Sequence, residues 1–293
     1  MNTQSRVDCI GIGVQRSATT WLFESITQHP QLMPAQIPND KELNFFNHNW
    51  EKGIYWYHHL FEFGPWKTIE YSTLYFHDRN VPERIYKYNS AAKLILMVRN
   101  PIDRALSQHK HEIRRNRLPE ELYDFSRAME QNPSYVEQGR YATHLDNYLQ
   151  FFGPSQVHIV LYDDVGKDAE GVLKGLFSFL GVAPDFKPAN TSKRVNVAKA
   201  QRNQSLSSIL GLSRTIRGVA GEAPVKLLKA TGLPGLLRRT NEIEIDDRLV
   251  PPMSDEARAY IHSELDGEVL RLEKAIGRDL SHWRQPRQPD TRG

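Results

Sequence analysis

Residues 10–22 constrain the fold more than any other part of the chain, because an apolar run passes there directly into a helical pattern. Residues 7–14 predict a buried parallel strand, and residues 20–28 have the spacing of an amphipathic helix. The first amides of a helix lack internal partners and carry partial positive charge. A strand, a tight turn and a helix N-terminus therefore predict a phosphate-binding geometry.

The side chains in this turn suit an anion. Ser17 and Ala18 are small, which allows the backbone to approach a phosphate closely, and Thr19 or Thr20 can add a hydroxyl donor. Arg16 supplies a full positive charge at the same place. We therefore treat these five residues as candidate anion ligands, while a turn that binds nothing stays open from this stretch alone.

The turn differs from the Walker A loop of nucleotide triphosphatases, which requires G-x-x-x-x-G-K-[ST]. Counted from Gly13, Ala18 stands where the second glycine belongs and Thr19 stands where the lysine belongs. The cation is Arg16, inside the loop. The pattern indicates a P-loop-like phosphate turn that is not built for an ordinary Mg-nucleoside triphosphate.

Length and composition indicate a globular protein. Its 293 residues suffice for one large α/β domain or for a domain with a helical appendage, and its charged and apolar fractions are ordinary. The single cysteine, Cys9, lies in the first predicted strand, which favours a buried structural thiol and excludes an internal disulfide. We find no signal-peptide pattern and no apolar run of membrane-spanning length, so we expect a cytoplasmic protein.

The net charge of +3 hides a local asymmetry. Residues 193–239 contain ten basic residues and one acidic residue, so the remainder has 28 basic and 34 acidic residues. Such a stretch suits an anionic ligand, peripheral contact with an anionic lipid surface, or a solvated face, and the sequence leaves these open. Nothing indicates a nucleic-acid partner.

Further strands and helices alternate along the chain. Strands are predicted at residues 67–72, 92–98 and 157–162, and helices at residues 82–88, 101–115, 120–131, 140–152 and 168–180, the last ending at Gly181. The predicted fold is three-layer α/β/α with a central, mostly parallel sheet. We expect one domain over residues 1–293, with a core at 7–190, a basic lid or loop region at 191–250, and a C-terminal helix at 254–283. Ser254 would cap that helix and Trp283 would fold back onto the core.

A second anion site is predicted after the strand at residues 92–98. Arg99 stands at the carboxyl end of that strand, where open α/β sheets bind ligands. Pro101 and Asp103 suit a helix start, which places Ser107 inside the helix. Arginine can hold a phosphate through two parallel hydrogen bonds and serine through its hydroxyl. Two phosphate sites on neighbouring strand ends fit a donor with a 5′ anhydride and a 3′-phosphate better than a triphosphate.

At this point the sequence resembles the sulfotransferases that use 3′-phosphoadenosine 5′-phosphosulfate (PAPS). The resemblance runs over residues 7–200 and returns at the C-terminal helix, with residues 15–21 similar to the family's 5′-phosphosulfate loop and residues 99–107 to its 3′-phosphate motif. The heparan sulfate branch is most similar, through Glu42 with Phe45–Phe46, residues 48–57, and Glu70 with Tyr75–Phe76. The ending at residues 277–283 resembles bacterial members.

The resemblance implies a role for each matching residue. Donor binding falls on the phosphate turn, the second anion site and a late basic pair: Arg16, Ser17, Ala18, Thr19, Thr20, Trp21, Arg99, Ser107, Lys193 and Arg194. Trp21 would lie near the adenine. Arg16 would be catalytic and stabilise the bridging oxygen and the charge on the sulfuryl group. Glu42 would act as the base that accepts the acceptor's proton.

Three positions depart from the family pattern. Arg16 replaces a lysine seen in many members, and Ala18 replaces a glycine. Tyr71 stands where the heparan sulfate branch has a lysine that helps to hold donor or acceptor. An acceptor other than heparan sulfate therefore stays open.

The predicted function is in-line transfer of a sulfuryl group from PAPS to a hydroxyl or amine of a carbohydrate or other small-molecule or lipid acceptor, without a metal. A nucleotide-dependent kinase and a non-catalytic nucleotide-binding protein are the alternatives. His109 and His111 are rival bases, although a solvated helix face explains them as well. The aromatic residues 55–57 suit either sugar stacking or the core, and the sequence does not indicate an oligomeric state.

Overall fold

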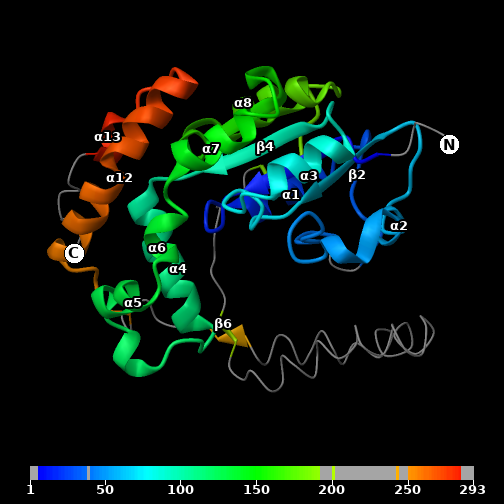
Figure 1. Cartoon of the computed structure of the whole chain (residues 1–293). Helices are drawn as coiled ribbons and strands as arrows, with labels where there is room; N and C mark the ends of the chain where they lie inside the picture. Colours follow the sequence, from blue (N-terminus) through cyan, green and yellow to red (C-terminus); the bar gives the residue numbers. More distant parts are fainter. Residues whose placement is uncertain (1–5, 38–39, 192–199, 202–241, 244–249, 285–293) are drawn as a thin grey trace. The chain divides into compact units, whose positions relative to one another are not determined.

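The computed structural model describes residues 6–37, 40–191, 200–201, 242–243 and 250–284, and Figure 1 traces their course. The chain divides into two compact units: Met1–Ala105 with Pro133–Val195 and Arg258–Gly293, and Leu106–Asn132 with Asn196–Ala257. One domain over residues 1–293 stays a prediction. Most of the expected lid, at residues 192–199, 202–241 and 244–249, lies outside the described residues.

The first unit contains a parallel sheet, as the sequence predicts. Its strands, in the part of the chain that the structure describes, are β1 (Cys9–Gly13), β2 (Leu32–Met33), β3 (Lys67–Tyr71), β4 (Lys93–Val98) and β5 (Val157–Leu161). The order is β2-β3-β1-β4-β5, and every pairing is parallel. Since β1 pairs with both β3 and β4, the carboxyl ends of these three strands lie at one edge of the sheet.

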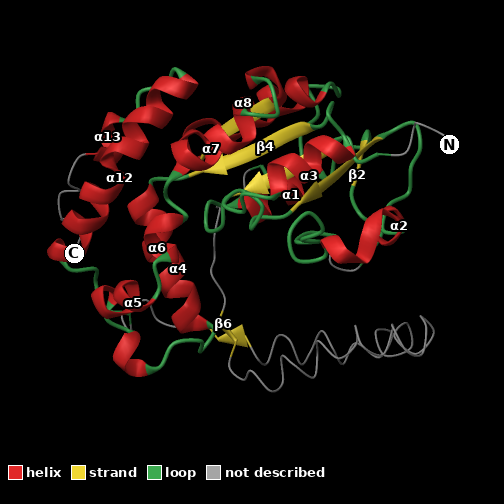
Figure 2. Cartoon of the chain, viewed as in Figure 1, coloured by secondary structure: helices red, strands yellow, loops and turns green. Residues whose placement is uncertain are grey.

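Helices connect these strands, and Figure 2 shows them in red around the yellow strands. Those of the first unit are α1 (Thr19–Ile26), α2 (Gly53–His58), α3 (Val81–Tyr88), α6 (Ser134–Glu137), α7 (Tyr141–Leu149), α8 (Tyr162–Leu180) and α13 (Ser281–Arg284). Helices α4 (Pro101–Arg114) and α12 (Asp255–Ile276) continue from one unit into the other. The second unit contains α5 (Phe125–Gln131) and the antiparallel strands β6 (Ala200–Gln201) and β7 (Glu242–Ile243).

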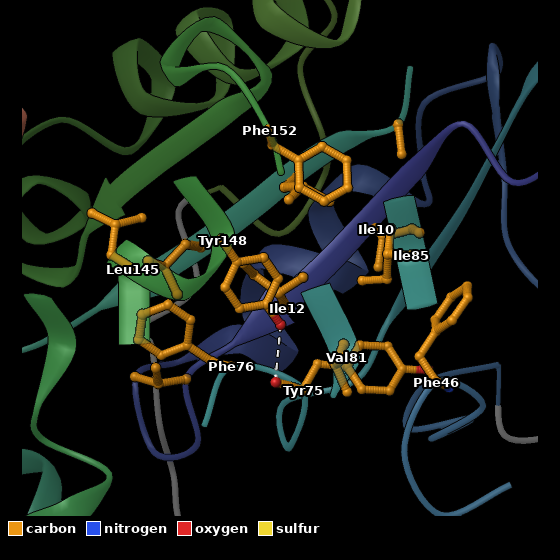
Figure 3. Close-up of a cluster of buried hydrophobic side chains, with 14 of the residues drawn as sticks. Ile10, Ile12, Phe46, Tyr75, Phe76, Val81, Ile85, Leu145, Tyr148 and Phe152 are labelled. Atoms are coloured by element: carbon orange, nitrogen blue, oxygen red, sulfur yellow. Dashed lines mark hydrogen bonds between the residues drawn. The ribbon is translucent and has the colours of Figure 1, made fainter. Parts of the chain in front are cut away.

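Alternating strand residues form two separate apolar clusters, one on each face of the sheet. On one face, Ile10 and Ile12 of β1 pack with residues of α3 and α7, and Figure 3 shows this cluster. The hydroxyl of Tyr148 there donates to the backbone oxygen of Tyr75 at 2.9 Å. On the other face, Cys9 packs with residues of α1 and α8. Because side chains of a strand alternate between faces, helices on both sides bury the sheet, which confirms the three-layer prediction.

Several predicted helix ends are confirmed. Helix α8 ends at Gly181, whose φ of +74° suits glycine. The N–H of Ala257 donates to Ser254 Oγ at 3.1 Å, so Ser254 caps α12. Trp283 is buried, with 2% of its surface exposed.

Other elements differ from the prediction. The helix predicted at residues 120–131 is a 3-10 turn (Glu120–Leu122) followed by α5, because Asp124 is extended and its carboxylate accepts the N–H of Arg127 at 3.0 Å. Helix α8 begins at Tyr162, and the predicted start at Asp168 is a non-helical residue inside it. The short elements β2 and α2 were not predicted; β2 has only two residues, too few for a periodic pattern. Within the described ranges, no helix has the length and apolarity needed to span a bilayer.

Candidate active site

The turn between β1 and α1 has an unusual backbone. Arg16 and Ala18 have φ values of 70° and 64°, in the left-handed region that non-glycine residues seldom adopt. Ala18 is the N-cap of α1, and no side chain caps the helix there. Strained residues of this kind concentrate at ligand-binding turns, and the exposed amides of the first helical turn attract an anion.

Ser17 lies at the centre of this turn and is completely buried. Its Oγ has no hydrogen-bond partner among the described residues. A buried hydroxyl without a partner costs about 1–3 kcal/mol, so natural structures seldom keep one without a reason. An anion bound at the turn would accept a hydrogen bond from this hydroxyl. It could accept another from the hydroxyl of Thr20, which is exposed. Thr19 is buried, and its Oγ1 accepts a hydrogen bond from Lys41 Nζ at 3.3 Å.

Replacing Ala18 by glycine is expected to raise the free energy of unfolding by up to about 1 kcal/mol, because the left-handed conformation penalises a residue with a Cβ atom and not glycine. Urea denaturation of the full chain measures this. The matched control is Ala91→Gly at an exposed residue outside the left-handed region, which is expected to lower stability. Equal changes in both variants would contradict the strain at Ala18.

Helix α1 is hydrogen-bonded to Asn190, which precedes the basic stretch at residues 193–239 in the sequence. The indole N–H of Trp21 donates to Asn190 O at 3.3 Å, and Ser25 Oγ and Gln28 Nε2 donate to Asn190 Oδ1 at 3.1 and 2.9 Å. Trp21 packs in the apolar cluster with α8, and its placement near an adenine stays a prediction. Lys193 and Arg194 follow within four residues of Asn190 but lie outside the described residues.

Arg99 directly follows β4, next to the turn that follows β1. Its guanidinium lies 4.7 Å from the ring centroid of Tyr162, and Asp103 lies 3.9 Å from its NH2 nitrogen. The hydroxyl of Tyr141 donates to the Arg99 carbonyl at 2.9 Å, which fixes the backbone. Arg99 Nε is buried and has no hydrogen-bond partner among the described residues. The side chain is therefore oriented by its neighbours and retains a donor for an anion.

Helix α13 contacts the residues that follow Arg99 and Tyr162. Asn100 Nδ2 donates to Trp283 O at 3.3 Å, and Trp283 Nε1 donates to Asp163 Oδ2 at 2.6 Å. His282 Nε2 lies 2.8 Å from the same carboxylate oxygen. Asn100 also caps α4, since its Oδ1 accepts the N–H of Ile102 at 2.9 Å. Helix α13 thus contacts the segments that follow β4 and β5, beside the predicted second anion site.

Glu42 lies in the loop before α2, beside the phosphate turn. Its φ is 61°, and its N–H donates to Tyr71 O at 2.8 Å. The carboxylate accepts the N–H of Thr73 at 2.8 Å and the Thr73 hydroxyl at 3.0 Å. Lys41 Nζ lies 2.6 Å from Glu42 Oε1 and also donates to Thr19. The structure thereby connects the predicted base with the predicted phosphate turn.

A buried carboxyl group, that of Glu70, is linked through hydrogen bonds to the loop that contains Glu42. Glu70 is fully buried and accepts the hydroxyls of Tyr57 at 2.8 Å and Tyr75 at 3.0 Å. Tyr75 in turn accepts the N–H of Phe46 at 3.2 Å, and Ser72 Oγ accepts the N–H of Asn44 at 3.0 Å. Burial raises the pKa of Glu70 to about 8, although the tyrosine hydroxyls act in the opposite direction.

The remaining candidates, Ser107, His109 and His111, all lie on α4. Ser107 lies on α4 in the second unit, and its pairing with Arg99 stays a prediction. His109 is buried, so a solvated face is wrong for it; its Nε2–H donates to Tyr123 O at 2.9 Å. Burial also lowers the pKa of His109. His111 lies on the same helix, and no described geometry supports it as the base.

Sequence reasoning missed Lys41, Thr73, Asn100 and Asn190. Lys41 directly precedes Glu42, and Asn100 directly precedes a proline at a helix start, so both had a local signal. Thr73 contacts Glu42 across 31 residues of sequence, and Asn190 contacts Trp21 across 169. A single sequence gives no signal for contacts between residues so far apart. In the described ranges, no group of three or more His, Cys, Asp or Glu side chains is arranged to hold a metal ion.

Comparisons with known proteins identify relatives by sequence and by fold. Heparan sulfate glucosamine 3-O-sulfotransferase 5 from Mus musculus is 33% identical over 192 residues, which cover 61% of this chain and 54% of that protein. Bifunctional heparan sulfate N-deacetylase/N-sulfotransferase 3 from Homo sapiens is 30% identical over 195 residues, 60% of this chain and 22% of that protein. The chain thus spans about half the length, or less, of these relatives.

A solved sulfotransferase from Alicyclobacillus acidocaldarius has the same fold, with a TM-score of 0.67 and 23% identity, over 96% of this chain and 99% of that one. The family model described as "Sulfotransferase domain" matches residues 6–210, more than half of the sequence. The chain belongs to the sulfotransferase domain family.

Proposed function

We propose that this protein transfers a sulfuryl group from PAPS to a hydroxyl or amine of a carbohydrate or other small-molecule acceptor. The observation that carries the proposal is a pair of buried donors without partners among the described residues, Ser17 Oγ and Arg99 Nε. They follow β1 and β4, which are adjacent parallel strands. Two anion sites at neighbouring strand ends suit the two phosphate positions of this donor.

The residues present fit the donor. PAPS supplies an activated sulfuryl group on its 5′-phosphate, and it also has a 3′-phosphate. Ser17, Thr19 and the α1 amides would hold the 5′-phosphate, with Arg16 adding charge. Arg99 would hold the 3′-phosphate through its guanidinium. Ser107, Lys193 and Arg194 complete the donor site as proposed from the sequence.

Glu42 is proposed as the base. Its carboxylate is fixed by Thr73 and remains 36% exposed, so it can reach an acceptor hydroxyl. It would take the acceptor's proton as the acceptor oxygen or nitrogen attacks the sulfuryl group. The α1 amides and Arg16 would stabilise the charge that develops on the leaving phosphate.

The loop that contains Glu42 also has two side-chain oxygens that can accept hydrogen bonds from the substrate that receives the sulfuryl group. Asn44 Oδ1 and Asn47 Oδ1 are buried without a partner among the described residues. A carbonyl oxygen can only accept, so both suit the hydroxyl or amine hydrogens of an acceptor. The relatives named for heparan sulfate support a carbohydrate. Of the three aromatic residues considered for sugar stacking, Tyr57 is buried in the core and Tyr55 is 85% exposed.

Cytoplasmic location and membrane contact through residues 193–239 stay predictions. The kinase alternative has no additional support, because the turn has Thr19 where a Walker lysine would stand. A non-catalytic role would leave the strained Glu42 beside the phosphate turn without an explanation.

The test is calorimetric binding of 3′-phosphoadenosine 5′-phosphate (PAP) and, separately, of Mg-ATP. We expect the wild-type chain to bind PAP more tightly than Mg-ATP. Arg99→Ala is expected to weaken PAP binding about 100-fold, because it removes a charged hydrogen-bonding group from a partly buried site.

Arg127→Ala, at an exposed arginine of α5, is the matched control and should leave PAP binding unchanged. Preference for Mg-ATP over PAP would overturn the proposed function and favour the kinase. PAP binding that survives Arg99→Ala would remove Arg99 from the donor site.

A further inference from the structure

Lys41 lies between two parts of the proposed site, although the proposed reaction gives it no role. Its Nζ lies 2.6 Å from Glu42 Oε1 and 3.3 Å from Thr19 Oγ1, so one ammonium group joins the proposed base to the phosphate turn. The side chain is only 16% exposed, so most of its surface is covered by other residues. Lys41 is therefore held in the site and not on a solvated face.

The ring of Tyr71 supports this placement. Lys41 Nζ lies 5.4 Å from the ring centroid, within the range of a cation–π contact. Tyr71 is fully buried, and its hydroxyl donates to Gly13 O at 2.6 Å. A Cβ atom added at Gly11 would lie 2.1 Å from this ring, so the tyrosine packs directly on β1. The aromatic surface beneath the ammonium is therefore rigid.

We propose that Lys41 is a catalytic residue that contacts the sulfuryl group while it is transferred. The inference rests on the proposed function, in which Glu42 lies at the acceptor and the α1 turn holds the 5′-phosphate. During in-line transfer, the sulfuryl group passes between these two places. The Lys41 ammonium group, which contacts both Glu42 and Thr19, is within reach of the sulfuryl oxygens, on which negative charge is spread.

The proton balance of the step suits this role. A bond forms between the acceptor oxygen or nitrogen and sulfur, and the bond from sulfur to the bridging oxygen breaks, leaving its electron pair on the phosphate. The acceptor's proton passes to Glu42, which becomes neutral. Lys41 keeps its proton throughout. As Glu42 loses its charge, its attraction for Lys41 weakens, and the ammonium becomes available to the sulfuryl and phosphate oxygens.

A purely stabilising ion pair does not explain the arrangement. Glu42 already accepts two hydrogen bonds from Thr73. The backbone of Glu42 is left-handed, with φ of 61°, and the side chains of the consecutive residues Lys41 and Glu42 meet there. Backbone strain of this kind costs more than a partly exposed ion pair contributes, so the pairing is maintained for the site.

The test compares PAPS with PAP, which differ by the sulfuryl group alone. Calorimetry gives the Kd of each for the wild type, Lys41→Met and Lys41→Arg. We expect Lys41→Met to leave the Kd for PAP within about threefold and to raise the Kd for PAPS about tenfold, because charge-assisted hydrogen bonds contribute at this scale. Conversion of PAPS to PAP, with water as acceptor, is expected to fall about 100-fold, and Lys41→Arg to recover part of it.

Lys52→Met is the matched control, because that lysine stacks on Trp56 at 4.4 Å and contacts neither Glu42 nor Thr19. If Lys41→Met changes PAPS and PAP affinities equally, or changes neither, the inference is overturned while the donor site stands. If the wild type binds neither PAP nor PAPS, the proposed function itself fails, and this is seen before any variant is made.

Discussion

Replacing Glu42 by glutamine is expected to lower the rate of sulfuryl transfer about 10²–10⁴-fold, the usual contribution of a general base. Glutamine has nearly the same shape and can still accept the N–H of Thr73, which the glutamate accepts at 2.8 Å. It cannot take up a proton. The effect should therefore fall on kcat, while binding of PAP stays within about threefold of the wild type.

The measurement is PAP formation from PAPS, first with water and then with any acceptor that increases the rate. Glu51→Gln, at an exposed glutamate in the 3-10 turn before α2, is the matched control and should behave like the wild type. A Glu42→Gln variant with full activity would exclude Glu42 as the base. Loss of PAP binding together with activity would instead assign Glu42 to the shape of the donor site.

The second large effect is expected on stability and is dependent on pH. The folded-state pKa of Glu70 is raised from 4.5 to about 8 by burial. Between these pH values the folded chain binds more protons at this group than the unfolded chain does. The contribution of Glu70 is therefore fully present below about pH 4.5 and is lost as pH rises through 8. We expect this loss to amount to a few kcal/mol.

Glu70→Gln isolates this contribution from other titrating groups, because glutamine is neutral at every pH and keeps one carbonyl acceptor for the tyrosine hydroxyls. Urea unfolding at several pH values should show the wild type losing stability relative to Glu70→Gln as pH rises from 4.5 to 8. Such a comparison is needed because burial also lowers the pKa of His77 to about 4, and that residue changes stability in the opposite direction. A constant difference between the variants would show that Glu70 does not titrate in this range.

Strands β1 and β4 were predictable because each lies in a nearly continuous apolar run. Residues 92–98 are nearly all apolar, and β4 is buried on both faces. Residues 7–14 gave β1 for the same reason, with ends that differ by one or two residues. Helix ends were predictable where a local signal exists, as at Gly181 and Ser254. The 3-10 turn before α5 was not predictable, because the capping hydrogen bond that Asp124 accepts competes with continuation of the helix.

The site was predictable to the extent that its residues are consecutive. Arg16 to Trp21 and Arg99 are placed by strand ends, which a pattern of apolar residues locates. The contacts that link these parts are not consecutive. Thr73 reaches Glu42 across 31 residues, and Lys41 reaches Thr19 across 22. The left-handed backbone at Glu42 also has no signal in its sequence, because glutamate rarely adopts it.

Because α13 contacts Asn100 and Asp163, we expect residues 281–284 to report the donor binding that we propose at Arg99. Trp283 is hydrogen-bonded to Asn100 and Asp163, which directly follow Arg99 and Tyr162 in the segments after the adjacent strands β4 and β5. A ligand of Arg99 binds more tightly when α13 holds Asn100 and Asp163 in position. By thermodynamic linkage, the bound ligand must then stabilise the contacts of α13 by the same free energy that those contacts add to ligand binding. Binding of PAP at the proposed 3′-phosphate site should then slow amide exchange in residues 281–284, more than 180 residues from Arg99 in sequence.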